Sequence, residues 1–407
     1  GIAIVGVANP INFIVMGFLI GSAYGFGVIM ARSFGAGDFK EFRKYFFNSI
    51  ILSIIIGIVF TIVLSLVNSY LLKLISTPAE LFDGAHKFLF ILYIGCASSL
   101  IYNLFAATLR SIGNSFTPVL FLLLSVVINA ILAYVFVAIF GWGVEGSAVA
   151  TIIAQAASAL CCYVYINRKY PQIRLTKQDA VLDISHMKNL ILQGAPMGMQ
   201  FSFTGIGLIV VQKFLNGFGT NYIAGYSVGV RIQNIVSYVY VALGTAISTF
   251  ISQNIGAKRM YRIPKAVKYT TLITIGCAIF STIVIRFFGP NFISLFTTAP
   301  NEELTHATVT YFNNVTLAYI PLGLIILYRS ALQGYGFPIT AMMAGIIELI
   351  NRVVIVIFLT DSFGFLAICL ADSVNWVITA VFLLTVYFIA ARSHKNKNKE
   401  FYIEPSM

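Results

Sequence analysis

Residues 45–70 have the sequence YFFNSIILSIIIGIVFTIVLSLVNSY and contain no Asp, Glu, Lys or Arg. About 20 apolar residues in a helix span the ~30 Å hydrocarbon core of a bilayer, so this stretch predicts a transmembrane helix. Over all 407 residues, 59% are hydrophobic and 10% are charged, and the mean hydropathy is +0.90. Soluble domains are about a quarter charged, and disordered chains are poor in apolar residues. The composition therefore excludes both classes.

Similar apolar stretches recur along the sequence, and we expect eleven membrane-spanning helices. They lie near residues 8–31, 45–70, 87–110, 118–140, 144–166, 190–215, 221–252, 266–288, 307–333, 338–360 and 365–390. Of the 26 Lys and Arg residues, 20 fall on one side of this topology, near residues 32–44, 110, 168–188, 258–268, 329 and 392–399. Basic residues concentrate in cytoplasmic loops. We therefore expect a multi-pass protein of the bacterial inner (plasma) membrane with a cytoplasmic C-terminus, and the net charge of +12 indicates topology rather than a nucleic-acid surface.

The sequence contains an internal repeat. ARSFGAG at 31–37 and SQNIGAK at 252–258 each end a predicted span. The matching pairs are Gly35 and Gly256 at an offset of 221, Asn129 and Asn351 at 222, and Gly113 and Gly336 at 223. Both copies keep the same sidedness, which predicts a parallel repeat with its axis along the membrane normal. The second copy has six spans and the first has five, so we expect a parent of twelve spans whose first helix precedes Gly1.

This repeat predicts an all-α membrane protein built from two pseudo-symmetric six-helix bundles. We expect an N-terminal helical lobe at 1–166, a cytoplasmic connector at 167–189, a C-terminal lobe at 190–390 and a basic cytoplasmic tail at 391–407. Gly17, Gly21 and Gly25 form a stripe of small residues that predicts close packing against another helix. Pro196 is expected to kink its span and to leave a backbone carbonyl without its helical partner.

Several segments of the sequence resemble the MATE family of multidrug and toxin efflux transporters. They are the Gly-Ala turns at Gly35 and Gly256, the turns LRSIGN at 109–114 and LQGYG at 332–336, and GWGVEGSAVAT at 141–151. The resemblance runs from Gly1 to about Ala390. It implies antiport, in which cationic and often aromatic compounds leave while sodium ions or protons enter, with no other cofactor.

The resemblance also implies a cation site in the N-terminal lobe. The family's Asn on the fifth helix and Thr on the sixth correspond to Asn129 and Thr151. The carboxylate that often follows four residues after the Asn is Ala133 in this chain, and the Asp of the family's first helix would precede Gly1. The choice between sodium ions and protons therefore stays open.

The positions of these two residues agree with a polar contact inside the membrane. Asn129 lies 11 residues beyond Pro118, and Thr151 lies eight beyond Gly143. These separations correspond to depths of about 16 and 12 Å from opposite faces. An amide and a hydroxyl oxygen are ligands that a hard cation accepts. A hydrogen bond that only holds the two helices together is the alternative, with equal weight.

Two acidic residues within predicted spans are candidates for proton coupling, because ionisable groups are costly inside a membrane. Glu348 is followed at i+4 by Arg352, which predicts an intrahelical ion pair that is either structural or proton-responsive. Asp372 has no evident partner in the sequence. It either carries a coupling proton or faces water.

Other function classes have less support. The sequence has no His/Cys set with metal-ligand spacing, no Gly-rich phosphate loop and no nucleophile constellation, so we expect neither an enzyme nor a metal site. A lipid or lipid-linked oligosaccharide flippase of the same architecture is the main alternative, although only two basic residues, Arg231 and Arg352, lie far from the ends of the predicted spans. Two pseudo-symmetric halves favour alternating access over a channel. We expect small-molecule cationic substrates, a surrounding lipid bilayer, no nucleic-acid partner and a monomer.

Overall fold

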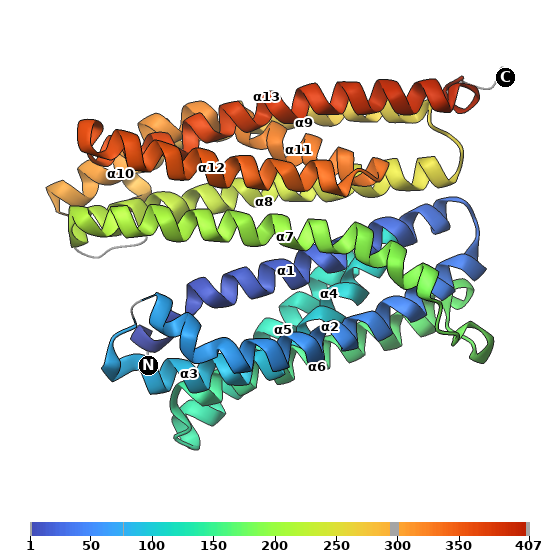
Figure 1. The fold of residues 1–407 in the computed structure, drawn as a ribbon, viewed down its shortest axis with the longest axis horizontal. Coiled ribbons are helices and arrows are strands. Elements are labelled where there is room, and N and C mark those ends of the chain that lie inside the picture. Colours follow the sequence, from blue (N-terminus) through green and yellow to red (C-terminus); the bar gives the residue numbers. More distant parts are fainter. Residues whose placement is uncertain (1, 76, 294–300, 404–407) are drawn as a thin grey trace. The chain divides into compact units, whose positions relative to one another are not determined.

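The computed structural model describes residues 2–75, 77–293 and 301–403, and every regular element in these ranges is a helix (Figure 1). The chain divides into two compact units, Gly1–Ser202 and Phe203–Met407. The first contains α1 (Ile2–Gly35), α2 (Phe39–Leu74), α3 (Ala79–Ile94), α4 (Cys96–Ser111), α5 (Phe116–Tyr134), α6 (Gly143–Lys169) and the first part of α7 (Ile184–Leu215). The second contains the rest of α7, α8 (Thr220–Gly256), α9 (Arg262–Ile293), α10 (Glu302–Val315), α11 (Tyr319–Tyr335), α12 (Pro338–Phe363) and α13 (Phe365–Lys397).

The number of membrane-spanning helices agrees with the sequence. Among the described residues, ten spans are long and apolar enough to cross a membrane, and there are eleven when the bent pair α3 and α4 counts as one. The predicted all-α membrane fold is confirmed. The sequence did not reveal that α3 and α4 meet at 47°. They meet at Gly95, where a Cβ would lie 2.4 Å from Ile152 Cγ1 of α6, so a larger residue there would displace the Ile152 side chain.

The internal repeat is visible in how equivalent helices end. Gly113 and Gly336, which follow α4 and α11 closely, have left-handed backbones with φ of 90° and 94°. Glycine adopts this conformation without a Cβ clash. After α1 and α8, the left-handed residue lies two positions beyond the motif glycines Gly35 and Gly256. It is Gly37 (φ 71°) in one copy and Lys258 (φ 56°) in the other.

The hydrogen bonds of these ends also match between the copies. At each of the four helix ends, the backbone N–H of the residue after the left-handed residue donates to the carbonyl five residues earlier, as in a Schellman cap. The bonds are Asp38 N–H to Ser33 O (3.1 Å) and Arg259 N–H to Asn254 O (2.8 Å), and then Asn114 N–H to Leu109 O (2.9 Å) and Phe337 N–H to Leu332 O (2.9 Å). The two copies therefore share local geometry as well as sequence.

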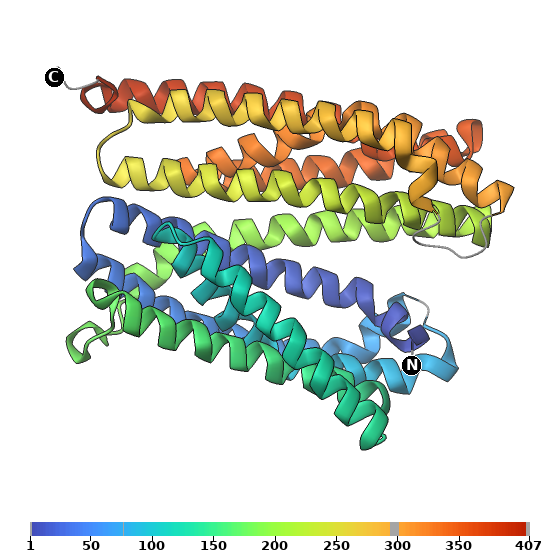
Figure 2. The same cartoon turned by 180° about the vertical axis from the view of Figure 1, so that it is seen from behind.

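Helix packing repeats in the same order within each unit. In the N-terminal unit α1 packs on α4 and α5 packs on α6; in the C-terminal unit α8 packs on α11 and α12 packs on α13. Figure 2 shows α5 and α6, coloured teal to green, side by side, and Figure 1 shows α12 beside α13. Equivalent helices thus have equivalent neighbours.

The small-residue stripe of α1 packs against the first part of α7, which confirms the predicted close helix contact. A Cβ at Gly21 would lie 2.4 Å from Met197 O, and a Cβ at Gly25 would lie 2.5 Å from Gly194 Cα. Pro196 lies inside the continuous helix α7, within this contact. The first part of α7 therefore belongs to the N-terminal unit.

The boundary between the two units falls within α7, after Ser202, later in the chain than the predicted connector at 167–189. The connector packs on α2. Arg43 Nε donates to Asp179 Oδ2 at 2.8 Å, and the buried Asn48 donates to Val181 O at 3.1 Å. The polar groups of the connector are thus matched by polar groups at the start of α2.

The predicted tail at 391–407 is also packed over its described part. Helix α13 continues to Lys397, and a short 3₁₀ turn follows at Lys399–Tyr402. Phe401 O accepts a hydrogen bond from Tyr261 N–H at 3.0 Å, and Tyr402 Oη lies 3.2 Å from His394 Nδ1. These contacts hold the 3₁₀ turn against the loop between α8 and α9 and against the end of α13.

Candidate ion-coupling sites

The two residues proposed for the cation site lie on adjacent helices, and the structure brings them into direct contact. Asn129 on α5 donates from Nδ2 to Thr151 Oγ1 on α6 at 3.0 Å. Thr151 Oγ1 also donates to the backbone carbonyl of Ser147 at 2.9 Å. Both side chains are half-buried. The Asn129 bond uses the amide nitrogen, so the amide oxygen lies outside this contact.

Polar side chains continue along the same face of α6. Ser147, Thr151 and Gln155 are spaced by four residues, which places them one above the other on a helix. Gln155 is hydrogen-bonded to Ser99 of α4, and Ser99 is buried. Ser99 and Gln155 were not among the predicted site residues, although the spacing of four on α6 indicates a polar face.

The C-terminal unit contains a cluster of buried charges, and its pairing corrects the sequence prediction. Glu348 is not paired with Arg352 at i+4. It is paired with Arg329 of α11, while Arg352 Nε donates to Asp372 Oδ1 of α13 at 3.1 Å. Asp372, for which the sequence suggested no partner, is therefore ion-paired. Arg329 lies within α11 rather than in a loop, so it does not belong with the loop residues that indicated orientation.

Burial makes this cluster energetically important. Glu348, Arg352 and Asp372 are 4%, 5% and 3% exposed. Removing one partner of a buried pair leaves an uncompensated charge and costs about 3–5 kcal/mol. Glu348 Oε2 also accepts a hydrogen bond from Thr204 Oγ1 at 3.3 Å, whereas Arg352 Nη1 is a buried donor without a hydrogen-bond partner among the described residues.

The repeat places an asparagine contact in the C-terminal unit as well. Asn351, the counterpart of Asn129, donates to Asn375 Oδ1 of α13 at 3.3 Å. Thr379 donates to the same oxygen at 3.2 Å. Each unit thus has an amide contact between equivalent helices, but the buried charges accompany only the second among the described residues. In the same ranges, no group of three His, Cys, Asp or Glu side chains is arranged to hold a metal ion.

Comparison with known proteins identifies the family. The MatE family model matches residues 1–135 and 196–358. The probable multidrug resistance protein YpnP of Bacillus subtilis is 25% identical over 301 residues, which cover 72% of this chain and 66%, slightly less than two thirds, of YpnP. An FAD transporter of Shewanella oneidensis is 23% identical over 360 residues, which cover 86% of this chain and 78% of the relative.

Solved structures share the fold. One is the outward-facing conformation of a multidrug resistance MATE family transporter, with a TM-score of 0.88, 19% identity and coverage of 98% of this chain and 88% of that one. Another is the bent form of the Vibrio cholerae MATE transporter VcmN, with a TM-score of 0.86, 19% identity and coverage of 99% and 90%. These proteins are described as transporters, which agrees with the expectation that the chain is not an enzyme. Because the family model matches most of its length, the chain belongs to the MATE family.

Proposed function

We propose that this protein is a secondary active transporter that exports small cationic or aromatic compounds in exchange for inward sodium ions or protons, by alternating access. Membership of the MATE family and the description of YpnP as a probable multidrug resistance protein support this proposal. We further propose that it works as a monomer in the bacterial plasma membrane with its C-terminus in the cytoplasm. The excess of Lys and Arg on one side of the predicted topology supports that orientation.

The observation that carries the coupling-ion proposal is the contact between Asn129 and Thr151 at membrane depth. An entering cation is coordinated by the Asn129 amide oxygen and the Thr151 hydroxyl oxygen, which replaces the bond between them by two oxygen ligands. Such a cation biases transport only if it binds one conformation more tightly than the other. A site formed by two separate helices meets this condition, because small helix movements change both ligand positions.

Proton coupling is assigned to Glu348 and Asp372. A proton on Asp372 removes the charge that holds Arg352, and Arg352 then shares Glu348, which lies one helical turn away, with Arg329. The Nη1 donor of Arg352, which has no hydrogen-bond partner among the described residues, is available for this exchange. Leaving one partner of a buried ion pair uncompensated costs about 3–5 kcal/mol, which is enough to shift a balanced two-state equilibrium more than a hundredfold.

The test is efflux of a fluorescent aromatic cation from cells expressing the gene, with sodium and proton gradients imposed separately. We expect dye export under one of the two gradients. Asn129→Leu should abolish coupling while expression is kept. Asn351→Leu changes the equivalent residue of the other unit and is the matched control. Unchanged efflux in Asn129→Leu would remove the cation-site assignment.

The carboxylates are tested in the same assay. Asp372→Asn and Glu348→Gln should abolish export driven by a proton gradient. Glu145→Gln, which alters a half-exposed acid 3.6 Å from Lys87 Nζ, should leave it intact. Binding of the dye to purified variants separates lost coupling from lost folding. Full export in both variants at every pH would reject a coupling role for this cluster.

An anionic cargo, such as a lipid or a lipid-linked sugar, is the second candidate. The buried Arg352 Nη1 donor favours it, because a guanidinium hydrogen-bonds well to phosphate or carboxylate oxygens. If purified, membrane-inserted protein moves no dye under either gradient but moves a fluorescent anionic lipid between leaflets, this second candidate replaces the first.

A further inference from the structure

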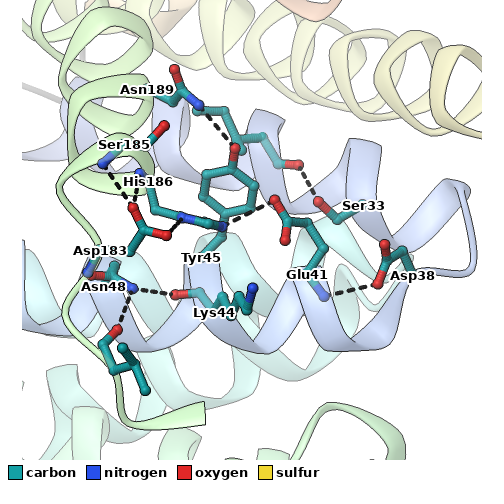
Figure 3. Close-up of polar contacts among 12 residues, drawn as sticks. Ser33, Asp38, Glu41, Lys44, Tyr45, Asn48, Asp183, Ser185, His186 and Asn189 are labelled. Atoms are coloured by element: carbon teal, nitrogen blue, oxygen red, sulfur yellow. Dashed lines mark hydrogen bonds and ion pairs between the residues drawn. The ribbon is translucent and has the colours of Figure 1, made fainter.

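A histidine lies between two carboxylates where the connector enters α7. His186, in the first turn of α7, has a side chain that is 10% exposed. Its Nε2 lies 3.0 Å from Glu41 Oε1 of α2, and its Nδ1 lies 2.7 Å from Asp183 Oδ2 (Figure 3). All three residues belong to the N-terminal unit.

This geometry requires a particular protonation state. A neutral imidazole has one N–H donor and one nitrogen lone pair, whereas a carboxylate only accepts hydrogen bonds. Among the described residues Nδ1 makes no hydrogen bond despite its short distance to Asp183, but with a carboxylate beside each ring nitrogen only the imidazolium form is attracted on both sides. Loss of one proton places a lone pair opposite a carboxylate at one nitrogen. One of the two contacts then becomes repulsive.

The surrounding groups hold both carboxylates in place. Asp183 Oδ1 caps α7 by accepting from Ser185 N–H at 2.8 Å, and Asn48 Oδ1 accepts from Asp183 N–H at 2.9 Å. Burial opposes ionisation of Asp183, but the hydrogen bonds from the Ser185 and His186 amides and the adjacent imidazole ring lower the pKa of this carboxyl below its usual value. Asp183 is therefore charged at every pH at which a histidine titrates.

The remaining neighbours of the ring are uncharged or cationic. The Tyr45 ring of α2 packs against it, with ring centroids 4.4 Å apart, and Tyr45 Oη accepts from Asn189 Nδ2 at 3.1 Å. The Arg32 guanidinium of α1 interacts electrostatically with Tyr45, and Lys44 contributes its backbone carbonyl to Asn48. The two carboxylates are thus the groups that favour a charged ring. The arrangement spans α2, the connector and α7.

We propose that His186 is a proton-binding site, and that the bound proton fastens the first turn of α7 and the end of the connector to α2. The ligand is a proton, since these side chains do not form a group able to hold a metal ion among the described residues. Histidine is the side chain that ordinarily changes charge between pH 5 and 8. The contact is therefore made at acidic pH and released at alkaline pH. This inference does not depend on which ion or cargo the transporter uses.

The test uses the full chain in lipid nanodiscs. The chain has four histidines, so ¹⁵N-histidine labelling gives few ring signals, and the signal that His186→Gln removes is assigned to His186. We expect an imidazolium at pH 6 and a neutral ring at pH 9. Amide hydrogen exchange in the first turn of α7, corrected for intrinsic rates, should be about tenfold faster at pH 9, the equivalent of one charge-assisted hydrogen bond.

Variants separate the proton from other effects of pH. His186→Gln should make the corrected exchange independent of pH, and His306→Gln, which alters an exposed histidine of α10, should leave the wild-type dependence. Glu41→Gln keeps the histidine and serves if His186→Gln does not fold. It removes the carboxylate at Nε2, so the corrected exchange of this variant should depend less on pH than that of the wild type. A neutral His186 ring at pH 6, or the same pH dependence in His186→Gln, would overturn the proposal.

Discussion

Replacing Gly21 by alanine should separate α1 from the first part of α7. An alanine Cβ at this position would lie 2.4 Å from Met197 O and 2.8 Å from Gly198 Cα. Both are backbone atoms, so no side-chain rotation relieves the overlap. Ordinary contact distances are about 3.5 Å, so the helices must move apart by about 1 Å.

The cost follows from two opposing effects. Overpacking a well-packed contact costs about 1–3 kcal/mol. Alanine is better than glycine in a helix by about 1 kcal/mol, which offsets part of that cost. We therefore expect Gly21→Ala to lower the free energy of unfolding by up to about 2 kcal/mol, at most about a thirtyfold change in the unfolding equilibrium. Adding Gly25→Ala should cost less than the sum, because one separation relieves both contacts.

The assay is unfolding by SDS in mixed micelles, followed by the fluorescence of Trp142 in a Trp376→Phe background. Trp142 is the tryptophan of the N-terminal unit, in which this contact lies. Gly6→Ala is the matched control, because it lies on the same helix and a Cβ there meets no atom within 4 Å. Gly6→Ala should be neutral or slightly stabilising. If Gly21→Ala is as stable as Gly6→Ala, the close backbone contact does not exist in the membrane protein.

Two further predictions concern the helix ends and the connector. Gly37→Ala should lower the free energy of unfolding by about 1–2 kcal/mol, the penalty for a side chain in the left-handed region. Lys258→Gly should raise the free energy of unfolding by somewhat less, because glycine also increases the conformational entropy of the unfolded chain. Burial alone raises the pKa of Asp179, but hydrogen bonds from Thr176 and the Arg43 guanidinium lower it below the usual value. The ionised Asp179 therefore stabilises the connector above pH ~4, and this stabilisation is lost as the pH falls through the folded-state pKa of Asp179. Amide hydrogen exchange of the connector, corrected for intrinsic rates, should accelerate in that acidic range. Asp179→Asn should remove this acceleration.

The sequence placed Asn129 and Thr151 at matching depths, which their contact requires, although depth alone does not show that the two helices face each other. Each residue was placed by counting along its own helix, and rise per residue is nearly constant. The connector was harder, since its polar composition is the same whether its groups meet water or meet Arg43 and Asn48 of α2. Composition reports how many hydrogen-bonding groups a segment has, but their partners lie more than 100 residues away in the sequence.

The partners of the buried charges inside the membrane could not be predicted from the sequence either. Glu348 and Arg352 have the spacing of an intrahelical pair, yet each is paired with a residue of a neighbouring helix. Within one helix an i,i+4 pair contributes only a few tenths of a kcal/mol, and Arg329 and Asp372 would be left as buried single charges if it formed alone. Pairing across helices neutralises all four groups at once. The sequence reveals how many acidic and basic residues the spans contain, but which of them pair depends on which helix faces meet. In the proposed coupling step, a proton on Asp372 would change this pairing.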